Sequence, residues 1–163
     1  MEIDTLFKDR EKLIKVLNEE SPIGCILTSG SFLEKCMILL LRDKFIKGSK
    51  TVDDVLNYNG MLGEYSSKAK LCYCLSLIDK EQYSDVIKIA EIRNLIAHSH
   101  ILIDFSEPKI VEKCNELKSC DKSLPKEFFN SINDVAKIAR IRFTDTVINV
   151  INDLMASSYL NKY

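Results

Sequence analysis

The sequence predicts an all-α protein, a single-domain bundle of about four long helices with shorter helices between them. Only five glycines and three prolines interrupt 163 residues, which favours long helices over many short strands. Apolar residues recur with a helical period, and no internal repeat, low-complexity segment or linker divides the chain. This length suits one hydrophobic core, so we expect a single domain over residues 1–163.

The first half of the chain predicts two long helices. Residues 4–19 carry apolar side chains at helical spacing, and Ser21 followed by Pro22 is typical of the start of a second helix, which could reach Ile46. The middle of this second helix, FLEKCMILLLRDKF, is apolar on most faces and should lie at the centre of the core. Thr51 can cap a short helix, VDDVLNY, and the NGMLG turn follows it.

The second half of the chain predicts two further helices in succession and a long C-terminal one. A helix over residues 64–78 precedes Asp79 and Gln82, which have the spacing of a capping box and should open a helix over residues 80–97. The remaining expected elements are an extended segment at 100–105, a short helix at 107–117, a loop at 118–123 and a long helix at 125–159.

Charge and cysteine usage limit the classes of function. The net charge is -1 and the pI about 6.2, whereas a protein that binds duplex DNA mainly through phosphates carries a basic excess. Any nucleic-acid contact must therefore be local or built by oligomerisation, and the absence of nucleic-acid binding fits the charge equally well. The charged, amphipathic N-terminus does not resemble a signal peptide, so the six cysteines should be reduced thiols in the cytoplasm.

Metal, cofactor and membrane functions find little support in the sequence. The CYC pair at 72–74 has no second pair at metal-ligand spacing and lies in an apolar helical stretch, where buried cysteines act as small hydrophobic residues. The apolar run CMILLL is too short to span a bilayer. We therefore expect no metal, no cofactor and no membrane association.

The stretch RNLIAHSH, residues 93–100, is the principal candidate for a functional site. On a helix, Asn94 and His98 share a face, and the long side chain of Arg93 can reach the same neighbourhood. Arginine can hold a phosphate, and histidine can take a proton from a ribose 2′-hydroxyl. Two copies in a homodimer would supply one histidine as base and one as acid. A histidine near a helix C-terminus is also favoured by the helix dipole, without any catalytic role.

The pattern Arg93-Asn94-x-x-x-His98 resembles the R-[polar]-x-x-x-H motif of the HEPN superfamily. The resemblance implies an all-α dimer and, in many members, metal-independent endoribonuclease activity in toxin–antitoxin or phage-defence systems. It implies catalytic roles for Arg93 and His98 and a supporting role for Asn94. Some members carry tyrosine two residues after the histidine as a target for modification, whereas this chain has His100 at that position.

A longer stretch of the chain resembles the mannitol repressor family. The resemblance rests on GSFLEKCMILLL, on NGMLGEYSSKAKLCYCLSLIDKEQYSDVIKIAEIRNLIAHS and on IDFSEPKI, and spans about residues 30–112. It implies a transcriptional regulator of a sugar-alcohol operon. The chain shows no helix-turn-helix with a basic recognition helix, so such a regulator would act through a protein partner.

Other polar residues are weaker candidates. Glu34 interrupts the apolar central helix and could pair with Arg93 or His98, or be a solvent-facing or structural ion-pair residue. Lys68 follows Glu64 by four residues, which is typical of a solvated surface pair. A basic cluster on the last helix could follow an RNA backbone, although a solvated face is the commoner role. That cluster consists of Lys137, Arg140 and Arg142.

Three functions remain open from the sequence. The leading hypothesis is a HEPN-type, metal-independent endoribonuclease or ribonuclease-like regulator that cleaves RNA at a dimeric Arg/His site, whereas the other two hypotheses involve no enzyme activity. The alternative is a non-catalytic regulator of the mannitol repressor type acting through protein partners. A third is an accessory or antitoxin subunit that binds nucleotide or RNA without cutting it.

Overall fold

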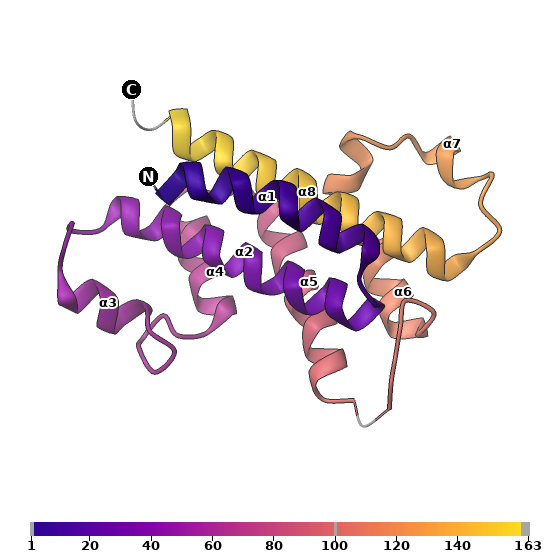
Figure 1. The fold of residues 1–163 in the computed structure, drawn as a ribbon, viewed down its shortest axis with the longest axis horizontal. Coiled ribbons are helices and arrows are strands. Elements are labelled where there is room, and N and C mark those ends of the chain that lie inside the picture. Colours follow the sequence, from indigo (N-terminus) through magenta and orange to yellow (C-terminus); the bar gives the residue numbers. More distant parts are fainter. Residues whose placement is uncertain (1, 100, 161–163) are drawn as a thin grey trace.

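A computed structural model describes residues 2–99 and 101–160, and all regular structure in these two ranges is helical (Figure 1). Four helices have 18 residues or more, as the sequence predicts. The elements are α1 (Glu2–Glu19), α2 (Pro22–Lys44), α3 (Lys50–Leu56), α4 (Tyr65–Cys74), α5 (Lys80–Ala97), α6 (Pro108–Asn115), the 3-10 helix η1 (Ser119–Lys122), α7 (Lys126–Phe129) and α8 (Val135–Leu160).

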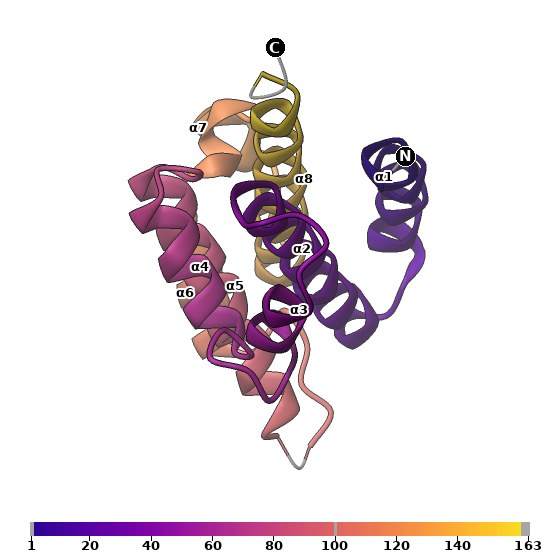
Figure 2. The ribbon, with the colours of Figure 1, turned by 90° about the vertical axis from the view of Figure 1, so that its left-hand side faces the viewer.

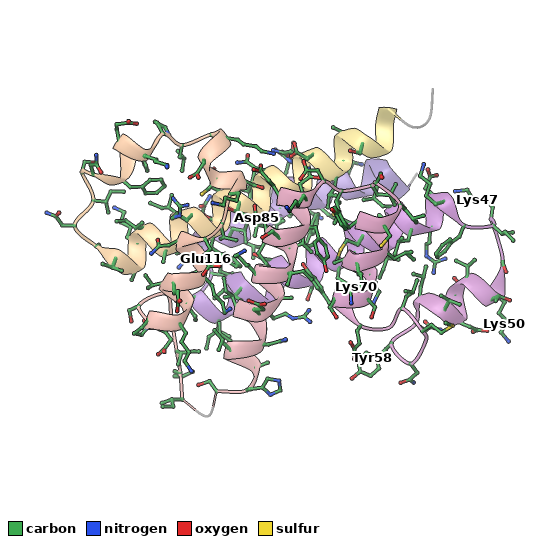
Figure 3. All side chains as sticks on the ribbon, turned by 180° about the vertical axis from the view of Figure 1, so that it is seen from behind. Lys47, Lys50, Tyr58, Lys70, Asp85 and Glu116 are labelled. Carbon is green, nitrogen blue, oxygen red and sulfur yellow. The ribbon has the colours of Figure 1, made fainter. Side chains whose placement is uncertain are left out.

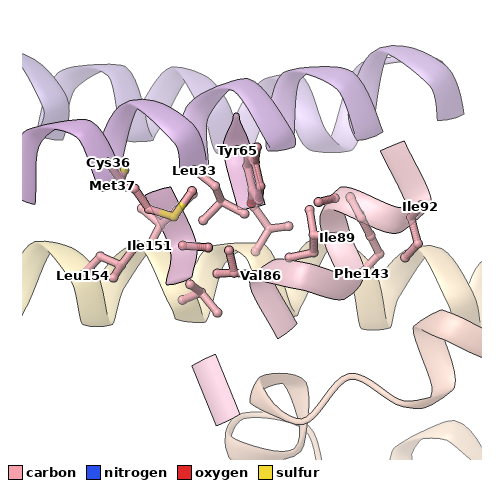
Figure 4. Close-up of a cluster of buried hydrophobic side chains, with 14 of the residues drawn as sticks. Leu33, Cys36, Met37, Tyr65, Val86, Ile89, Ile92, Phe143, Ile151 and Leu154 are labelled. Carbon is pink, nitrogen blue, oxygen red and sulfur yellow. The ribbon is translucent and has the colours of Figure 1, made fainter. Parts of the chain in front are cut away.

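The central helix α2 organises the fold by packing against α1, α4, α5 and α8. Seen end-on, α1 lies on one side of α2 and α8, while α4, α5 and α6 lie on the other (Figure 2). Figure 4 shows the core where α2, α4, α5 and α8 meet, with Leu33, Val86 and Ile151 among its buried side chains. By length and composition α2 could cross a membrane, but 44% of its most apolar window is buried inside the bundle, as expected of a core helix.

Two predicted helix starts are confirmed by their capping geometry. The Ser21 hydroxyl accepts a hydrogen bond from the backbone N–H of Gly24 at 3.1 Å, and Pro22 occupies the first helical position. Asp79 and Gln82 form the reciprocal capping box of α5, each side chain accepting from the other residue's N–H at 2.8 Å. These side chains bond N–H groups that have no partner within the helix, which sets where α2 and α5 begin.

Two predicted helix boundaries are wrong for identifiable reasons. The helix expected over 64–78 ends at Cys74, because Ser76 adopts φ +56° and the chain turns there, so that Leu77 enters the core. The helix expected from Pro125 begins ten residues later. The carboxylate of Asp134 accepts a hydrogen bond from the N–H of Lys137 at 3.0 Å and opens α8 after the short α7.

Candidate functional site

The end of α5 carries the predicted motif, but its members have different surroundings. Arg93 is half-buried and reaches back over α2 and α4, whereas Asn94 and His98 are exposed. His98 is the C-terminal cap residue of α5, and its backbone N–H donates to the carbonyl oxygen of Asn94 at 3.0 Å. Within the described residues, no hydrogen bond or ring contact joins Arg93 to His98. His100, at the position of the HEPN tyrosine, lies outside the described residues.

Arg93 is engaged by side chains from two other helices. A guanidinium nitrogen lies 3.8 Å from a carboxylate oxygen of Glu34 on α2. The guanidinium also stacks 5.0 Å from the ring centroid of Tyr65, the first residue of α4. Gly30 makes room for the stem of the arginine, since a Cβ at that position would lie 2.9 Å from Cδ of Arg93. The sequence-based suggestion that Glu34 pairs with Arg93 therefore agrees with this geometry.

Glu34 has a second and closer cation, which the sequence did not single out. The Nζ of Lys68 lies 2.8 Å from a Glu34 carboxylate oxygen and donates a second hydrogen bond, at 2.7 Å, to the carbonyl oxygen of Gly63. The expectation that Lys68 forms a solvated pair with Glu64 is wrong, because the Lys68 side chain is only 2% exposed. Lys68 lies three residues after Tyr65, so the two side chains share one face of α4, and Tyr65 is buried. This spacing is the sequence signal that could have indicated the burial of Lys68.

Together these side chains form a polar cluster that joins α2, α4 and α5, named here the Glu34 cluster and consisting of Glu34, Tyr65, Lys68 and Arg93. Two cations share one carboxylate, so the charge left over is positive, and Arg93 is its more accessible cation. Burial raises the pKa of the Tyr65 hydroxyl well above its usual range, and that hydroxyl has no hydrogen-bond partner among the described residues. The tyrosine is therefore neutral, and its ring packs in the core (Figure 4) and supports the guanidinium of Arg93 through the cation–π contact.

Whether one chain can form a ribonuclease site depends on Arg93 and His98, which have different surroundings. Cleavage through a 2′-hydroxyl needs a phosphate-binding cation and a base at the same phosphodiester. Here the guanidinium of Arg93 already contacts Glu34 at 3.8 Å, while His98 lies at the exposed end of α5. A phosphate bound at Arg93 would have to share the guanidinium with this carboxylate.

The basic residues of α8 are not gathered on one free surface. Arg140 donates from Nη2 to the carbonyl oxygens of Leu17 and Glu20, at 2.9 and 2.6 Å, and so binds the C-terminal end of α1. Arg142 points to other neighbours, donating to carbonyl oxygens at and just after the end of α6. Only Lys137 of the three is exposed. Both arginines therefore hold the fold together, and a role in RNA binding stays a prediction.

All six cysteines are free thiols. Cys72 is buried, as the sequence predicts for the CYC pair, but Cys74 is exposed near the end of α4. Desolvation by burial raises the pKa of the Cys72 thiol to about 12. Among the described residues, no group of three or more histidine, cysteine, aspartate or glutamate side chains is placed to hold a metal ion.

Comparison with known proteins confirms one of the two family resemblances. The family model of the mannitol repressor, MtlR, matches residues 9–157, which is most of the chain. The chain belongs to the mannitol repressor family. The resemblance to the HEPN superfamily, and with it the interpretation of Arg93 and His98 as a catalytic pair, stays a prediction.

Solved structures of similar fold agree with this assignment. A chain of the MtlR–HPr complex from Escherichia coli matches with a TM-score of 0.72 at 20% sequence identity, covering 90% of this chain and 98% of that one. YggD from Shigella flexneri, a possible transcriptional regulator, matches with a TM-score of 0.72 at 15% identity, covering 89% of this chain and 97% of that one. No curated protein sequence matches this chain. At these identities the similarity establishes the all-helical fold.

Proposed function

We propose that this member of the mannitol repressor family is a non-catalytic transcriptional regulator of a sugar-alcohol operon that acts by binding a protein partner. The observation that carries the proposal is the family match over residues 9–157. The relative from Escherichia coli was solved in complex with HPr, which supports an HPr protein as the partner of this chain. The net charge of -1 and the internal engagement of Arg140 and Arg142 support action through protein contacts.

The cellular setting follows from the same proposal. We place the protein in the cytoplasm, where thiols stay reduced, and its six free cysteines are consistent with that location. The continuous match over residues 9–157 supports a single functional domain over the whole chain, residues 1–163. Homodimerisation remains a prediction, which light scattering after gel filtration would test directly.

The endoribonuclease hypothesis keeps one observation in its favour. Asn94 and His98 are both exposed and lie one helical turn apart, so a substrate could reach them. Against it stands the engagement of Arg93 by Glu34 and Tyr65. If the hypothesis holds, the protein cleaves RNA in EDTA to products ending in 2′,3′-cyclic phosphate, and His98→Ala abolishes this cleavage.

The regulatory proposal is tested by genetics in the host that encodes the protein. Deleting the gene should raise transcripts of the sugar-alcohol transport and dehydrogenase genes in the absence of the sugar alcohol. Complementation with wild type and with His98→Ala should restore repression equally, because no catalytic step involves the histidine. Unchanged transcripts in the deletion strain, or failure of a folded His98→Ala protein to complement, would overturn the proposal.

A further inference from the structure

A cleft lies where the end of α4, the start of α5 and the last third of α8 meet. Its volume is about 830 Å³, within the range of about 300–1,000 Å³ that is typical of small-molecule sites. Figure 3 shows Asp85, which lies about one helical turn beyond Gln82 of the cleft, where α5 runs beside α8. Both apolar and polar side chains line the cleft, so it offers a ligand packing surface as well as hydrogen bonds.

The inner part of the cleft is a hydrogen-bonded set centred on Gln82. The Gln82 side chain is buried, and its Oε1 accepts a hydrogen bond from the backbone N–H of Asp79 at 2.8 Å. Its Nε2 donates to Oδ2 of Asp153 on α8 at 3.0 Å. Because both ends of the amide are engaged, Gln82 ties the start of α5 to α8 and fixes the positions of the two aspartates.

Two further residues set the shape of the cleft. Ser76 has φ +56° and is the one non-glycine residue with a positive φ among those described. Residues other than glycine adopt this conformation at a cost, and such strain is found preferentially at active and ligand-binding sites. Tyr73 forms one wall, and its ring stacks on the ring of Tyr83 with 5.0 Å between the centroids. This contact holds an aromatic surface at the cleft although Tyr73 is 41% exposed.

The charges of the two aspartates in the cleft are already compensated. Asp79 caps the start of α5, where the helix dipole favours a negative charge. The Nζ of Lys122 lies 3.5 Å from Oδ2 of Asp153. A cationic ligand would therefore have to compete with charges that are in place, and an anionic ligand would be repelled by both carboxylates.

Each carboxylate nevertheless keeps one oxygen for a ligand. Oδ1 of Asp79 accepts from the N–H of Gln82 at 2.8 Å, and Oδ2 of Asp153 faces Gln82 and Lys122. The other oxygen of each aspartate has no hydrogen-bond partner among the described residues. A carboxylate oxygen only accepts hydrogen bonds, so a fitting ligand must donate them. A purely apolar ligand would displace water from these oxygens without replacing its hydrogen bonds, which is unfavourable.

We propose that this cleft binds a neutral polyhydroxy compound of the sugar-alcohol class. Its hydroxyl groups donate to the remaining oxygens of Asp79 and Asp153, the hydroxyl of Ser76 can donate or accept, and its carbon chain lies against the ring of Tyr73. The inference deepens the proposed function and rests on it for one element, the role of the bound sugar alcohol as the effector of the regulated operon.

The test is an NMR titration of the full-length protein with D-mannitol and with D-glucitol. Polyols also stabilise proteins by exclusion from the surface, so a rise in Tm alone would not identify a site. Chemical shifts of the backbone amides report where a ligand binds. We expect saturable shifts over residues 73–82 and 153–157, described by a single Kd.

A substitution that fills the cleft provides the deciding comparison. Ala156 lines the cleft and is exposed, so Ala156→Trp should abolish saturable binding without removing a hydrogen bond of the fold. The matched control is Ala97→Trp, at an exposed alanine at the opposite end of α5, which should bind like wild type. Asp153→Asn keeps the size of the side chain and should weaken binding by about 10-fold, as expected for one charge-assisted hydrogen bond. The amide spectra show whether each variant is folded.

The outcomes separate this inference from the proposed function. Saturable shifts in wild type and in Ala97→Trp that are lost in Ala156→Trp are the expected result. Shifts that do not saturate, that map elsewhere or that saturate equally in Ala156→Trp overturn the site. Saturation by the diamine putrescine and by neither polyol overturns the class of ligand. A gene deletion that leaves the operon transcripts unchanged overturns the proposed function, whereas the titration reports on the cleft in either case.

Discussion

Replacing the buried Lys68 by methionine should destabilise the protein although the side-chain volume changes little. Methionine fills the space of the lysine stem but removes the hydrogen bonds to Glu34 at 2.8 Å and to the Gly63 carbonyl at 2.7 Å. Hydrogen bonds to charged groups contribute about 1.5–3 kcal/mol each. Glu34 is 27% exposed and keeps Arg93 at 3.8 Å. Solvent and that cation therefore partly compensate Glu34 for the hydrogen bond lost from Lys68.

The expected loss for Lys68→Met is therefore about 2–4 kcal/mol in the free energy of unfolding. For a domain of this size it corresponds to a fall in Tm of roughly 4–16 °C. Urea unfolding followed by circular dichroism measures it directly. The control is Lys70→Met, two residues further along α4, whose exposed side chain should change stability by no more than about 0.5 kcal/mol. Equal stability of the two variants would refute the role assigned to Lys68.

Three further perturbations probe other parts of the account. Arg93→Met should cost about 1–2 kcal/mol through loss of the ion pair and the contact with the tyrosine ring, whereas His98→Ala should change the free energy of unfolding by less than about 0.5 kcal/mol. Asp85→Asn should cost about 2–4 kcal/mol in urea unfolding, because this fully buried carboxylate accepts hydrogen bonds from two backbone N–H groups and a serine hydroxyl at the start of η1. Stability should also fall as the pH rises above 9, since burial raises the pKa of five thiols. These are Cys25 and Cys120, raised to about 11, and Cys36, Cys72 and Cys114, raised to about 12, from the usual 9.0.

The sign of the pH effect follows from the order in which the two states lose protons. The unfolded chain releases thiol protons near pH 9, before the folded protein does, so the stabilisation is complete below pH 9 and is lost as the pH rises through the folded-state pKa values. Thermal unfolding between pH 8 and pH 10.5 should show a falling Tm. A Tm that stays constant over this range would contradict the pKa shifts.

The other two predictions have equally definite contrary outcomes. Similar destabilisation by Arg93→Met and His98→Ala would mean that the motif acts as a structural unit, against the separate surroundings seen here. An Asp85→Asn protein as stable as wild type would show that the start of η1 does not depend on that carboxylate.

The sequence predicts the helices well where local signals are strong and poorly where tertiary contacts decide. The Ser21 cap and the Asp79 capping box are local patterns, and both are present. The end of α4 depends on a single residue, Ser76, in the left-handed region, a conformation for which serine carries no sequence signal.

The candidate site shows the same division between local and long-range information. The pairing of Glu34 with Arg93 could be suggested because a carboxylate in an apolar helix needs a partner. The burial of Lys68 is not evident from the sequence because its spacing to Glu64 is typical of a surface pair, while its partners lie on α2 and in the loop between α3 and α4. Spacing along one helix does not reveal which face the bundle covers.

The central claim is that this protein acts by binding a partner and not by cutting RNA. Calorimetric titration of purified HPr into wild-type protein and into His98→Ala, at low salt, tests that claim most directly. We expect saturable binding with the same affinity for both proteins. Absence of binding to wild type, or binding that depends on the histidine, would contradict the account.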